Sequence, residues 1–329
     1  MALTKRHNYF PFDLFEFCDL PGQLGSDIRM LARYSMFPPF PWGQWLYARL
    51  IEENINQIEG EFIDLGVGMG GMSLFLGLRA REHQRKMYCL DSFTGLPALH
   101  PELDNPVFRE GDYGPPDGRD MTQWKDRLER RTRDFGLEEV VEVVPGFFDE
   151  TLRRLPPQAK FAFVHVDCDL YTSVRPVLDA LYDRVSDGGF IVIDDFFHPA
   201  QGPLRAAVSF FNARRITSLF HVSFPYTVVI KKGEKADTEN TLASFDGNIY
   251  SLDYLRSDRI FIETLEKCWR RANESADGRE PARNAGLLLS LLRDHDSAKK
   301  SDIYGYWYAL RDFWNGFQDS RYDRPVYTI

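Results

Sequence analysis

The sequence is poor in cysteine, in long apolar runs and in net positive charge, and each of these shortages excludes a class of protein. Its four cysteines include no C-x-x-C pair, so they indicate neither a zinc site nor a disulfide framework. No stretch approaches the roughly 18 apolar residues of a membrane span, and a net charge of −9 gives no general attraction to nucleic acid. We therefore expect a cytoplasmic protein that acts on a small molecule, without a nucleic-acid or membrane partner.

Short apolar segments alternate with helix-like segments through the middle of the 329-residue chain. Strands are predicted at residues 61–65, 87–91, 140–144, 161–167 and 190–194. A helix is predicted over residues 173–185, with Ser173 as its N-cap, and a hairpin around Pro225 adds an antiparallel strand. This alternation predicts an α/β fold with a doubly wound, mostly parallel sheet that has helices on both faces.

The two ends of the chain differ in composition from this middle region. Residues 1–45 predict an N-terminal arm, whose segment 34–45 is too dense in proline for regular structure. Residues 46–233 form the predicted α/β domain, which begins with a helix, and residues 234–329 predict a helical extension that ends in aromatic-rich sequence. These aromatics fit a substrate wall, a subunit interface or plain packing, and we expect a homo-oligomer, a dimer.

A glycine-rich turn, DLGVGMGG, follows the first predicted strand. Gly66, Gly68 and Gly70 allow the backbone to turn sharply and to approach a ligand closely. Dehydrogenases, flavoproteins and methyltransferases all use such a turn, and Gly71 completes a G-x-G-x-x-G match to the dinucleotide pattern. The turn therefore predicts a nucleotide-like ligand or a plain structural turn, without choosing among them.

Asp91 ends the next predicted strand, in CLDSFTGLP. From this position an acidic side chain accepts hydrogen bonds from both hydroxyls of a ribose, which favours an adenosine-containing ligand. The alternative is that Asp91 caps the turn that follows it.

Three more carboxylates end later strands: Asp167 ends FAFVHVD, and Asp194 and Asp195 end FIVIDD. In an open α/β sheet the carboxyl ends of central strands face one crevice, so these groups would repel one another unless a cation neutralises them. Oxygen ligands without His or Cys favour Mg²⁺, Mn²⁺ or Ca²⁺ over zinc. The alternative is that Asp194 and Asp195 only solvate a strand end and cap a loop.

Five motifs occur in a characteristic order: DLGVGMGG, DSFTGLP, GFFDETL, HVDCDLYTS and GGFIVIDDF. In this order they resemble the macrocin O-methyltransferase family, the metal-dependent sugar O-methyltransferases of macrolide biosynthesis, from about Phe62 to Lys232. The resemblance implies the seven-stranded, Rossmann-like sheet of class I methyltransferases and S-adenosylmethionine as the methyl donor.

The resemblance also assigns roles to individual residues. It implies that Mg²⁺ or Mn²⁺ is held by Asp167, Asp194 and Asp195. The cofactor-binding residues that it implies are Asp64, Gly66, Gly68, Gly70, Asp91, Ser92, Phe93, Gly146, Phe148 and Asp167.

The proton acceptor is the least defined part of the site. Well-known members of the family carry a histidine in the loop after D-S-F-x-G-x-P, proposed as the base, whereas residues 107–120 of this chain contain none. We predict that Asp167 or His198, which follows the acidic pair, takes the proton, with His100 as an alternative.

Together these features predict a metal-dependent O-methyltransferase of natural product or antibiotic biosynthesis. Its substrate is predicted to be a polyhydroxylated small molecule such as a sugar or a glycosylated natural product. The alternatives are an N- or peptide methyltransferase, a non-catalytic S-adenosylmethionine-binding protein and a nicotinamide-dependent oxidoreductase. The last of these has no need for acidic groups at the ends of later strands.

Overall fold

The computed structural model of the chain describes residues 26–27, 30–31, 34, 41–115, 121–196, 202–216, 220–223 and 227–233. The chain divides into two compact units, one of residues 1–45, 222–225 and 246–329 and the other of residues 46–221 and 226–245. The second unit contains most of the α/β sheet and most of the helices that cover it. The predicted helical extension and nearly all of the predicted N-terminal arm lie outside the described residues.

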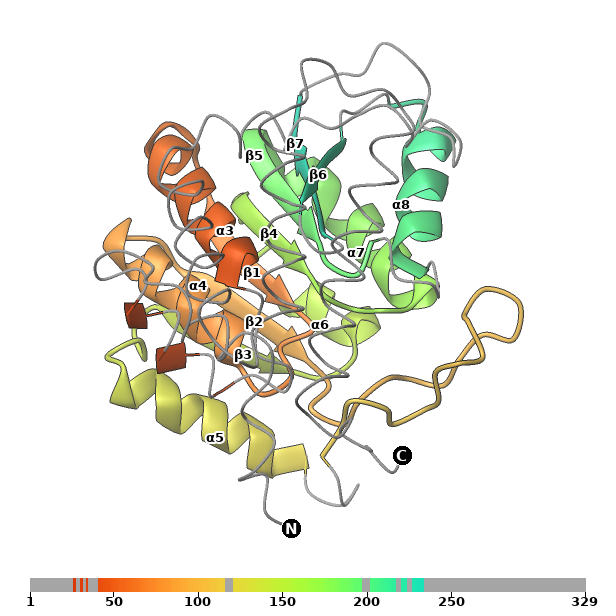
Figure 1. The fold of residues 1–329 in the computed structure, drawn as a ribbon, viewed down its shortest axis with the longest axis horizontal. Coiled ribbons are helices and arrows are strands. Elements are labelled where there is room, and N and C mark those ends of the chain that lie inside the picture. The colour runs from red at the N-terminus through yellow and green to blue at the C-terminus, as the bar shows by residue number, and fades with distance from the viewer. Residues whose placement is uncertain are drawn as a thin grey trace, which may run out of the picture. The chain divides into compact units, whose positions relative to one another are not determined.

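The described elements alternate between helix and strand (Figure 1). The helices are α3 (Pro41–Asn54), α4 (Gly71–Glu82), α5 (Met121–Asp134), α6 (Phe148–Arg154), α7 (Tyr171–Leu181) and α8 (Gly202–Ala213). The strands are β1 (Glu61–Leu65), β2 (Met87–Asp91), β3 (Val141–Pro145), β4 (Phe161–Val166), β5 (Val185–Ile193), β6 (Phe220–Ser223) and β7 (Thr227–Lys231). Within the described ranges, no helix has the length and apolar character to cross a membrane.

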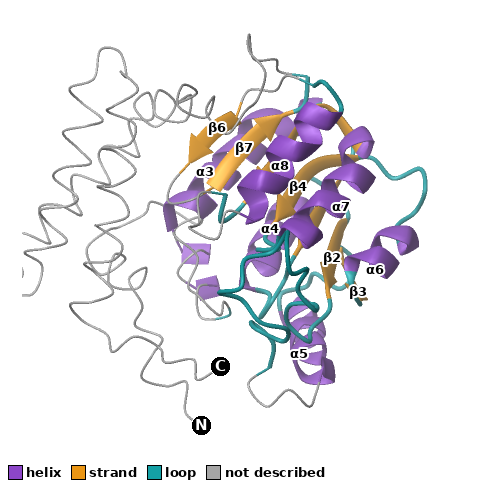
Figure 2. Cartoon of the chain, turned by 90° about the vertical axis from the view of Figure 1, so that its right-hand side faces the viewer, coloured by secondary structure: helices purple, strands orange, loops and turns teal. Residues whose placement is uncertain are grey.

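The strands form one sheet in the order β3-β2-β1-β4-β5-β7-β6. Strands β1 to β5 pair in parallel, and β7 runs antiparallel to β5. Helices lie on both faces of the strands (Figure 2). The predicted α/β fold with a doubly wound, mostly parallel sheet is therefore confirmed, and so is the antiparallel strand near its edge.

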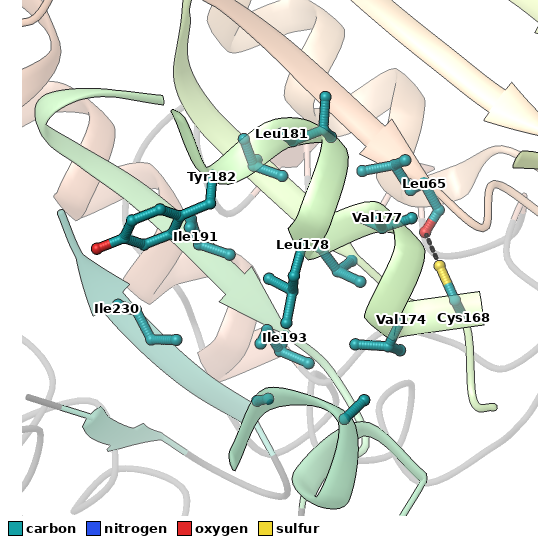
Figure 3. Close-up of a cluster of buried hydrophobic side chains, with 14 of the residues drawn as sticks. Leu65, Cys168, Val174, Val177, Leu178, Leu181, Tyr182, Ile191, Ile193 and Ile230 are labelled. Carbon is teal, nitrogen blue, oxygen red and sulfur yellow. Dashed lines mark hydrogen bonds between the residues drawn. The ribbon is translucent and has the colours of Figure 1, made fainter. Parts of the chain in front are cut away.

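Successive strand residues face opposite sides of the sheet, which gives the domain two buried layers. On one side, strand residues such as Leu65 and Ile191 pack with Val174 and Leu178 of α7 and with residues of α8 (Figure 3). On the other side, rings of β1, β4 and β5 contact one another, with centroid distances of 5.7 Å and 6.5 Å, and Tyr47 of α3 joins them. Strands β1, β2 and β4 are buried on both faces because helices cover both.

Two predictions about helix starts are wrong. Helix α3 begins at Pro41, inside the segment predicted to lack regular structure. Proline suits the first helical position, because its fixed φ matches the helix and its missing N–H is one that the helix leaves unbonded. Helix α7 begins at Tyr171, and its N-cap is Leu170 rather than Ser173. The side chain that accepts hydrogen bonds from the first turn of α7 does not lie next to the helix in the sequence. It comes from a distant loop, so the local sequence could not reveal it.

That group is the buried carboxylate of Asp104, in the loop after β2. It accepts hydrogen bonds from the Thr172 amide at 3.1 Å, from the Thr172 hydroxyl at 2.7 Å and from the His100 amide at 2.9 Å. One side chain therefore caps α7 and fastens the loop to it.

Replacing Asp104 with alanine is expected to lower the free energy of unfolding by about 2 kcal/mol, since it removes a helix cap and leaves buried donors unpaired. Urea unfolding of the two proteins measures the change. The matched control is Asp112→Ala, because Asp112 accepts a hydrogen bond from the Arg109 amide at 2.7 Å at an exposed site. Equal effects of the two substitutions would show that Asp104 has no special role in holding the loop.

Candidate functional site

The predicted site residues meet at the carboxyl edge of the sheet. Backbone hydrogen bonds of 2.8 to 3.1 Å continue the sheet one residue beyond its strands. The donors are the amides of Gly66, Asp167, Asp194 and Gly146, which follow β1, β4, β5 and β3. The glycine turn and the acidic residues therefore lie along one edge, where open α/β sheets bind their ligands.

The glycine turn follows β1 and leads into α4. The φ angles of Gly66, Gly68 and Gly70 are +88°, +51° and +89°, in the left-handed region that favours glycine. A Cβ on Gly66 would lie 1.8 Å from the Asp167 carbonyl oxygen, whereas a Cβ on Gly68 would have nothing within 4 Å. Gly66 is thus required by packing, whereas Gly68 borders open space.

Asp91 braces this turn. Its Oδ2 accepts hydrogen bonds from the amides of Val67 at 2.7 Å and Gly68 at 2.9 Å, and its Oδ1 accepts one from Phe93 at 2.5 Å. Burial raises the pKa of Asp91, and these three hydrogen bonds oppose the rise. The Phe93 bond is the turn cap that the alternative predicted. One lone pair remains on Oδ1, enough for one ribose hydroxyl rather than the two predicted. The ribose contact stays a prediction.

Other residues predicted to bind the cofactor lie in or beneath this edge. Asp64 is fully buried and its Oδ2 accepts a hydrogen bond from the Ser73 hydroxyl at 2.5 Å, so its bonds are made within the protein. Ser92 donates from its hydroxyl to the Gly95 carbonyl at 2.8 Å, and the Phe93 side chain is buried. Their direct contact with a cofactor stays a prediction.

The turn after β3 holds the two residues predicted to lie near an adenine. Gly146 has φ +133°, and Phe148 is the first residue of α6 and partly buried against the core. Between them, Phe147 is 43% exposed, which is high for a phenylalanine at the rim of a site. Phe147 was not among the predicted residues, because an aromatic side chain beside a strand end carries no local signal of exposure.

Four carboxylates gather next to the glycine turn, and we call Asp167, Asp169, Asp194 and Asp195 the carboxylate cluster. Burial, and after it the charges of the other three members, raises the pKa of Asp167 well above its ordinary value. Burial raises the pKa of Asp169 to about 6, although its side-chain interaction with Asp195 opposes the rise. The pKa of Asp195 is raised by burial and by the charges of Asp169 and Asp194. The predicted convergence of acidic groups is present, and Asp169 joins it.

The backbone at the cluster is shaped by one cysteine and two unusual φ angles. Cys168, which lies between Asp167 and Asp169, is buried, and its thiol donates a hydrogen bond to the Leu65 carbonyl at 3.3 Å (Figure 3). This bond attaches the backbone of the two aspartates to the end of β1. Asp169 and Asp195 have φ angles of +56° and +50°, a region that non-glycine residues seldom adopt. Such conformations concentrate at functional sites, where the surrounding structure holds them.

Asp194 differs from the other three carboxylates because three side chains donate to it. Its Oδ1 accepts hydrogen bonds from the hydroxyls of Tyr47, at 2.9 Å, and Thr227, and its Oδ2 pairs with His165 Nε2 at 3.1 Å. Burial alone would raise the pKa of Asp194, but the bonds from His165, Thr227 and Tyr47 hold it below its ordinary value. Asp194 is thus the one member of the cluster whose pKa is lowered rather than raised.

Tyr113 is another residue that sequence reasoning missed. It lies in the loop after β2, has φ +62° and is 40% exposed. Burial of its hydroxyl, and then the charges of Asp169 and Asp195, raise the pKa of Tyr113. The Tyr113 hydroxyl therefore interacts electrostatically with the carboxylate cluster.

The histidines proposed as proton acceptors receive no support from the geometry. His198 lies outside the described residues. His100 is exposed, and its ring accepts a hydrogen bond from the Glu102 amide at 3.2 Å. Their roles stay predictions.

The donor set of the cluster matches the requirements of a hard divalent cation. Its side chains offer carboxylate oxygens, and a bound cation would relieve the mutual repulsion that, after burial, raises the pKa values of Asp167 and Asp195. Across the residues that the structure describes, no three His, Cys, Asp or Glu side chains form a ready-made metal-binding group. The residues fit Mg²⁺ or Mn²⁺ by their chemistry, and metal binding by Asp167, Asp194 and Asp195 stays a prediction.

The raised pKa of Asp169 has a consequence for stability. Between its ordinary pKa of 3.8 and about 6, the folded protein binds more protons than the unfolded chain, so the free energy of unfolding falls as pH rises. In metal-free protein, the stability of Asp169→Asn relative to wild type is expected to increase by about 1–3 kcal/mol from pH 4 to pH 7. Urea unfolding at several pH values measures this. Asp126→Asn, at an exposed site on α5, is the control, and a difference for Asp169→Asn that does not change with pH would contradict the expectation.

Known proteins match a little over two fifths of this chain. The 8-demethyl-8-(2,3-dimethoxy-alpha-L-rhamnosyl)-tetracenomycin-C 4'-O-methyltransferase of Streptomyces olivaceus is 32% identical over 146 residues, which cover 42% of this chain and 54% of that protein. The mycinamicin III 3''-O-methyltransferase of Micromonospora griseorubida is 30% identical over 148 residues, covering 44% and 58%. The matched segments thus span a little over half the length of these relatives.

A solved structure and a family model extend the comparison. The O-methyltransferase NovP superposes with a TM-score of 0.56 at 21% identity, covering 64% of this chain and 97% of NovP, which shows a shared fold. The model of the Macrocin-O-methyltransferase (TylF) family matches residues 46–224, more than half of the chain. The resemblance carried by the five sequence motifs is confirmed, and the chain belongs to the macrocin O-methyltransferase family.

Proposed function

We propose that the chain transfers a methyl group from S-adenosylmethionine to a hydroxyl of a polyhydroxylated small molecule, a sugar or a glycosylated natural product, and that the reaction needs Mg²⁺ or Mn²⁺. The observation that carries the proposal is the position of the carboxylate cluster beside the glycine turn, at one edge of the sheet. The family membership and the names of the matched relatives support the reaction class.

The residues of the glycine turn and of the strand ends would bind the methyl donor. Gly68 leaves room for it, Asp91 offers a carboxylate oxygen to the ribose, and Phe147 and Phe148 lie beside the predicted adenine position. Fixing the donor methyl in line with the acceptor oxygen makes the displacement effectively unimolecular, which is worth roughly 7 to 11 kcal/mol.

The acceptor oxygen forms a bond to the methyl carbon while the carbon–sulfur bond breaks, so S-adenosylhomocysteine leaves and the hydroxyl proton must be taken up. Asp167 or His198 is the predicted proton acceptor. Asp167, Asp194 and Asp195 would hold the divalent cation, which when bound supplies a lowered hydroxyl pKa and a fixed orientation of the acceptor.

Methyl transfer to a panel of sugars and glycosides, followed by mass spectrometry for the gain of one methyl group, tests the proposal. We expect S-adenosylhomocysteine to bind in calorimetry and NADH not to bind. We also expect transfer to stop in excess chelator and to return with Mg²⁺. Transfer that persists in chelator would refute metal dependence alone, whereas binding of NADH in place of S-adenosylhomocysteine would refute the methyltransferase.

Two further parts of the proposal concern the whole protein. We propose a homodimer and a cytoplasmic location, as expected from the aromatic-rich tail and from the composition. Sedimentation of the full chain measures the oligomeric state directly, and a monomer at micromolar concentration would contradict the first part.

A further inference from the structure

Asp194 is oriented from three separate elements of the fold. Tyr47 in α3 and Thr227 in β7 both donate to Oδ1, and His165 in β4 pairs with Oδ2. A carboxylate oxygen accepts about two hydrogen bonds, so Oδ1 is saturated and Oδ2 retains one lone pair. The Asp194 side chain is 22% exposed, so that remaining lone pair belongs to a group that a ligand can reach.

His165 is the innermost of the three donors. Its side chain is 1% exposed and lies on the sheet face covered by α3, with its ring centroid 5.8 Å from that of Tyr47. Its Nδ1 pairs with Asp64 Oδ1 at 2.7 Å. Because carboxylates accept hydrogen bonds, an imidazole between two of them donates from both ring nitrogens. The hydrogen bond to Asp64 fixes the orientation of the His165 ring, and so it also fixes the direction in which Nε2 points toward Asp194.

Asp64 in turn links His165 to the cofactor side of the site. The second oxygen of Asp64 accepts a hydrogen bond of 2.5 Å from Ser73, in the first turn of α4 after the glycine turn. Ser73, Asp64, His165 and Asp194 thus form a continuous chain of hydrogen bonds beneath the glycine turn and the carboxylate cluster. We call these four residues the buried relay.

We propose that His165 is a positioning residue, which through the buried relay holds Asp194 Oδ2 in the orientation that binds a divalent cation. The inference rests on the proposed function, because it assigns a residue to the cation site proposed there. His165 touches neither the cation nor the substrate, and it acts only through Asp194.

Two substitutions of His165 distinguish the effect of its hydrogen bond to Asp194 from that of its hydrogen bond to Asp64. The amide of glutamine reaches the position of Nε2, so His165→Gln keeps a donor for Asp194. The amide of asparagine reaches only the position of Nδ1, so His165→Asn keeps the bond to Asp64 and loses the one to Asp194. His83→Asn, at the partly exposed end of α4, is the matched control for the same chemical change.

Titration of the full chain with Mn²⁺, followed by electron paramagnetic resonance of free Mn²⁺, tests the proposal. We expect His165→Asn to bind Mn²⁺ about 10- to 100-fold more weakly than wild type, as for other residues that orient metal ligands. His165→Gln should restore most of the affinity, and His83→Asn should leave it unchanged. Binding of S-adenosylhomocysteine, measured without metal, should stay within about threefold in all variants.

The outcomes separate this inference from the proposed function. If wild type binds Mn²⁺ and a folded His165→Asn binds it equally well, the positioning role is refuted while the cation site stands. If wild type binds no Mn²⁺, the cation site and the positioning role both fail.

A second measurement does not depend on whether the variants fold. In wild type labelled with ¹⁵N-histidine, the Nε2–H signal of His165 is expected to shift during a titration with Mg²⁺, at the concentration where calorimetry shows binding. A signal that stays constant while Mg²⁺ binds would also refute the inference.

Discussion

Replacing Asp167 with asparagine is expected to lower the rate of methyl transfer by about a thousandfold or more, because the variant loses both a predicted cation ligand and a proton acceptor. The same substitution is expected to make the metal-free protein more stable at pH 7. The pKa of Asp167 is raised by burial and by its three acidic neighbours, so the ionised side chain opposes folding. A neutral side chain of the same shape removes that repulsion.

Opposite changes in activity and stability would distinguish a functional carboxylate from a structural one. Asparagine preserves the structural bond at this position, because it is the Asp167 backbone amide that donates to the Leu65 carbonyl, at 2.8 Å. Transfer assays with the acceptor found by screening give the rate, urea unfolding gives the stability, and calorimetry gives the affinity for S-adenosylhomocysteine. Asp126→Asn controls for the same chemical change at an exposed site. Full activity of Asp167→Asn would remove this residue from the proposed mechanism.

The trade between activity and stability is typical of active sites, where like charges are held together at a cost to folding. Asp194 shows how the fold limits that cost. Its three donors keep it ionised, so the cluster has one fixed negative charge around which the pKa values of the others are raised. A cation that binds there would relieve the repulsion that remains.

Local patterns in the sequence were enough to predict the sheet and the residues at its edge. Buried strands of a parallel sheet are continuous apolar runs, so β1, β2 and β4 were visible directly, and their carboxyl ends had to meet at one edge. The convergence of Asp167, Asp194 and Asp195 follows from that topology alone.

The partners of those carboxylates were not predictable in the same way. Tyr47 and Asp194 are 147 positions apart, His165 and Asp64 are 101 apart, and nothing in the local pattern marks these pairs. The one available signal was His165 itself, a polar residue inside the apolar run of β4. A buried imidazole needs partners, and the sequence did not reveal which ones.

The predicted starts of two helices were wrong for a related reason. The cap of α7 is provided by Asp104, 68 positions away, so a search for a local cap selected Ser173 instead. The start of α3 failed because proline was taken as a breaker at a position where it suits the helix.

The glycine turn gives the largest expected effect on stability. Gly66→Ala is expected to lower the free energy of unfolding by more than about 3 kcal/mol, of which the left-handed φ accounts for about 1–2 kcal/mol. The rest comes from the new Cβ, which would lie 1.8 Å from the Asp167 carbonyl oxygen. Since that carbonyl is backbone, relief requires the ends of β1 and β4 to separate, and this would also move the carboxylate cluster.

Gly68→Ala is the matched comparison, because Gly68 also has a positive φ but its Cβ would meet nothing within 4 Å. It should cost only about 1 kcal/mol in urea unfolding. If the open space at Gly68 is where the methyl donor lies, the added methyl group should weaken binding of S-adenosylhomocysteine by about tenfold or more. Gly111→Ala, in the loop after β2 with φ +84° and equally open space, should cost similar stability and leave that affinity unchanged. Equal affinities for Gly68→Ala and wild type would place the cofactor elsewhere, because a site filled by the donor cannot accept an extra methyl group without loss.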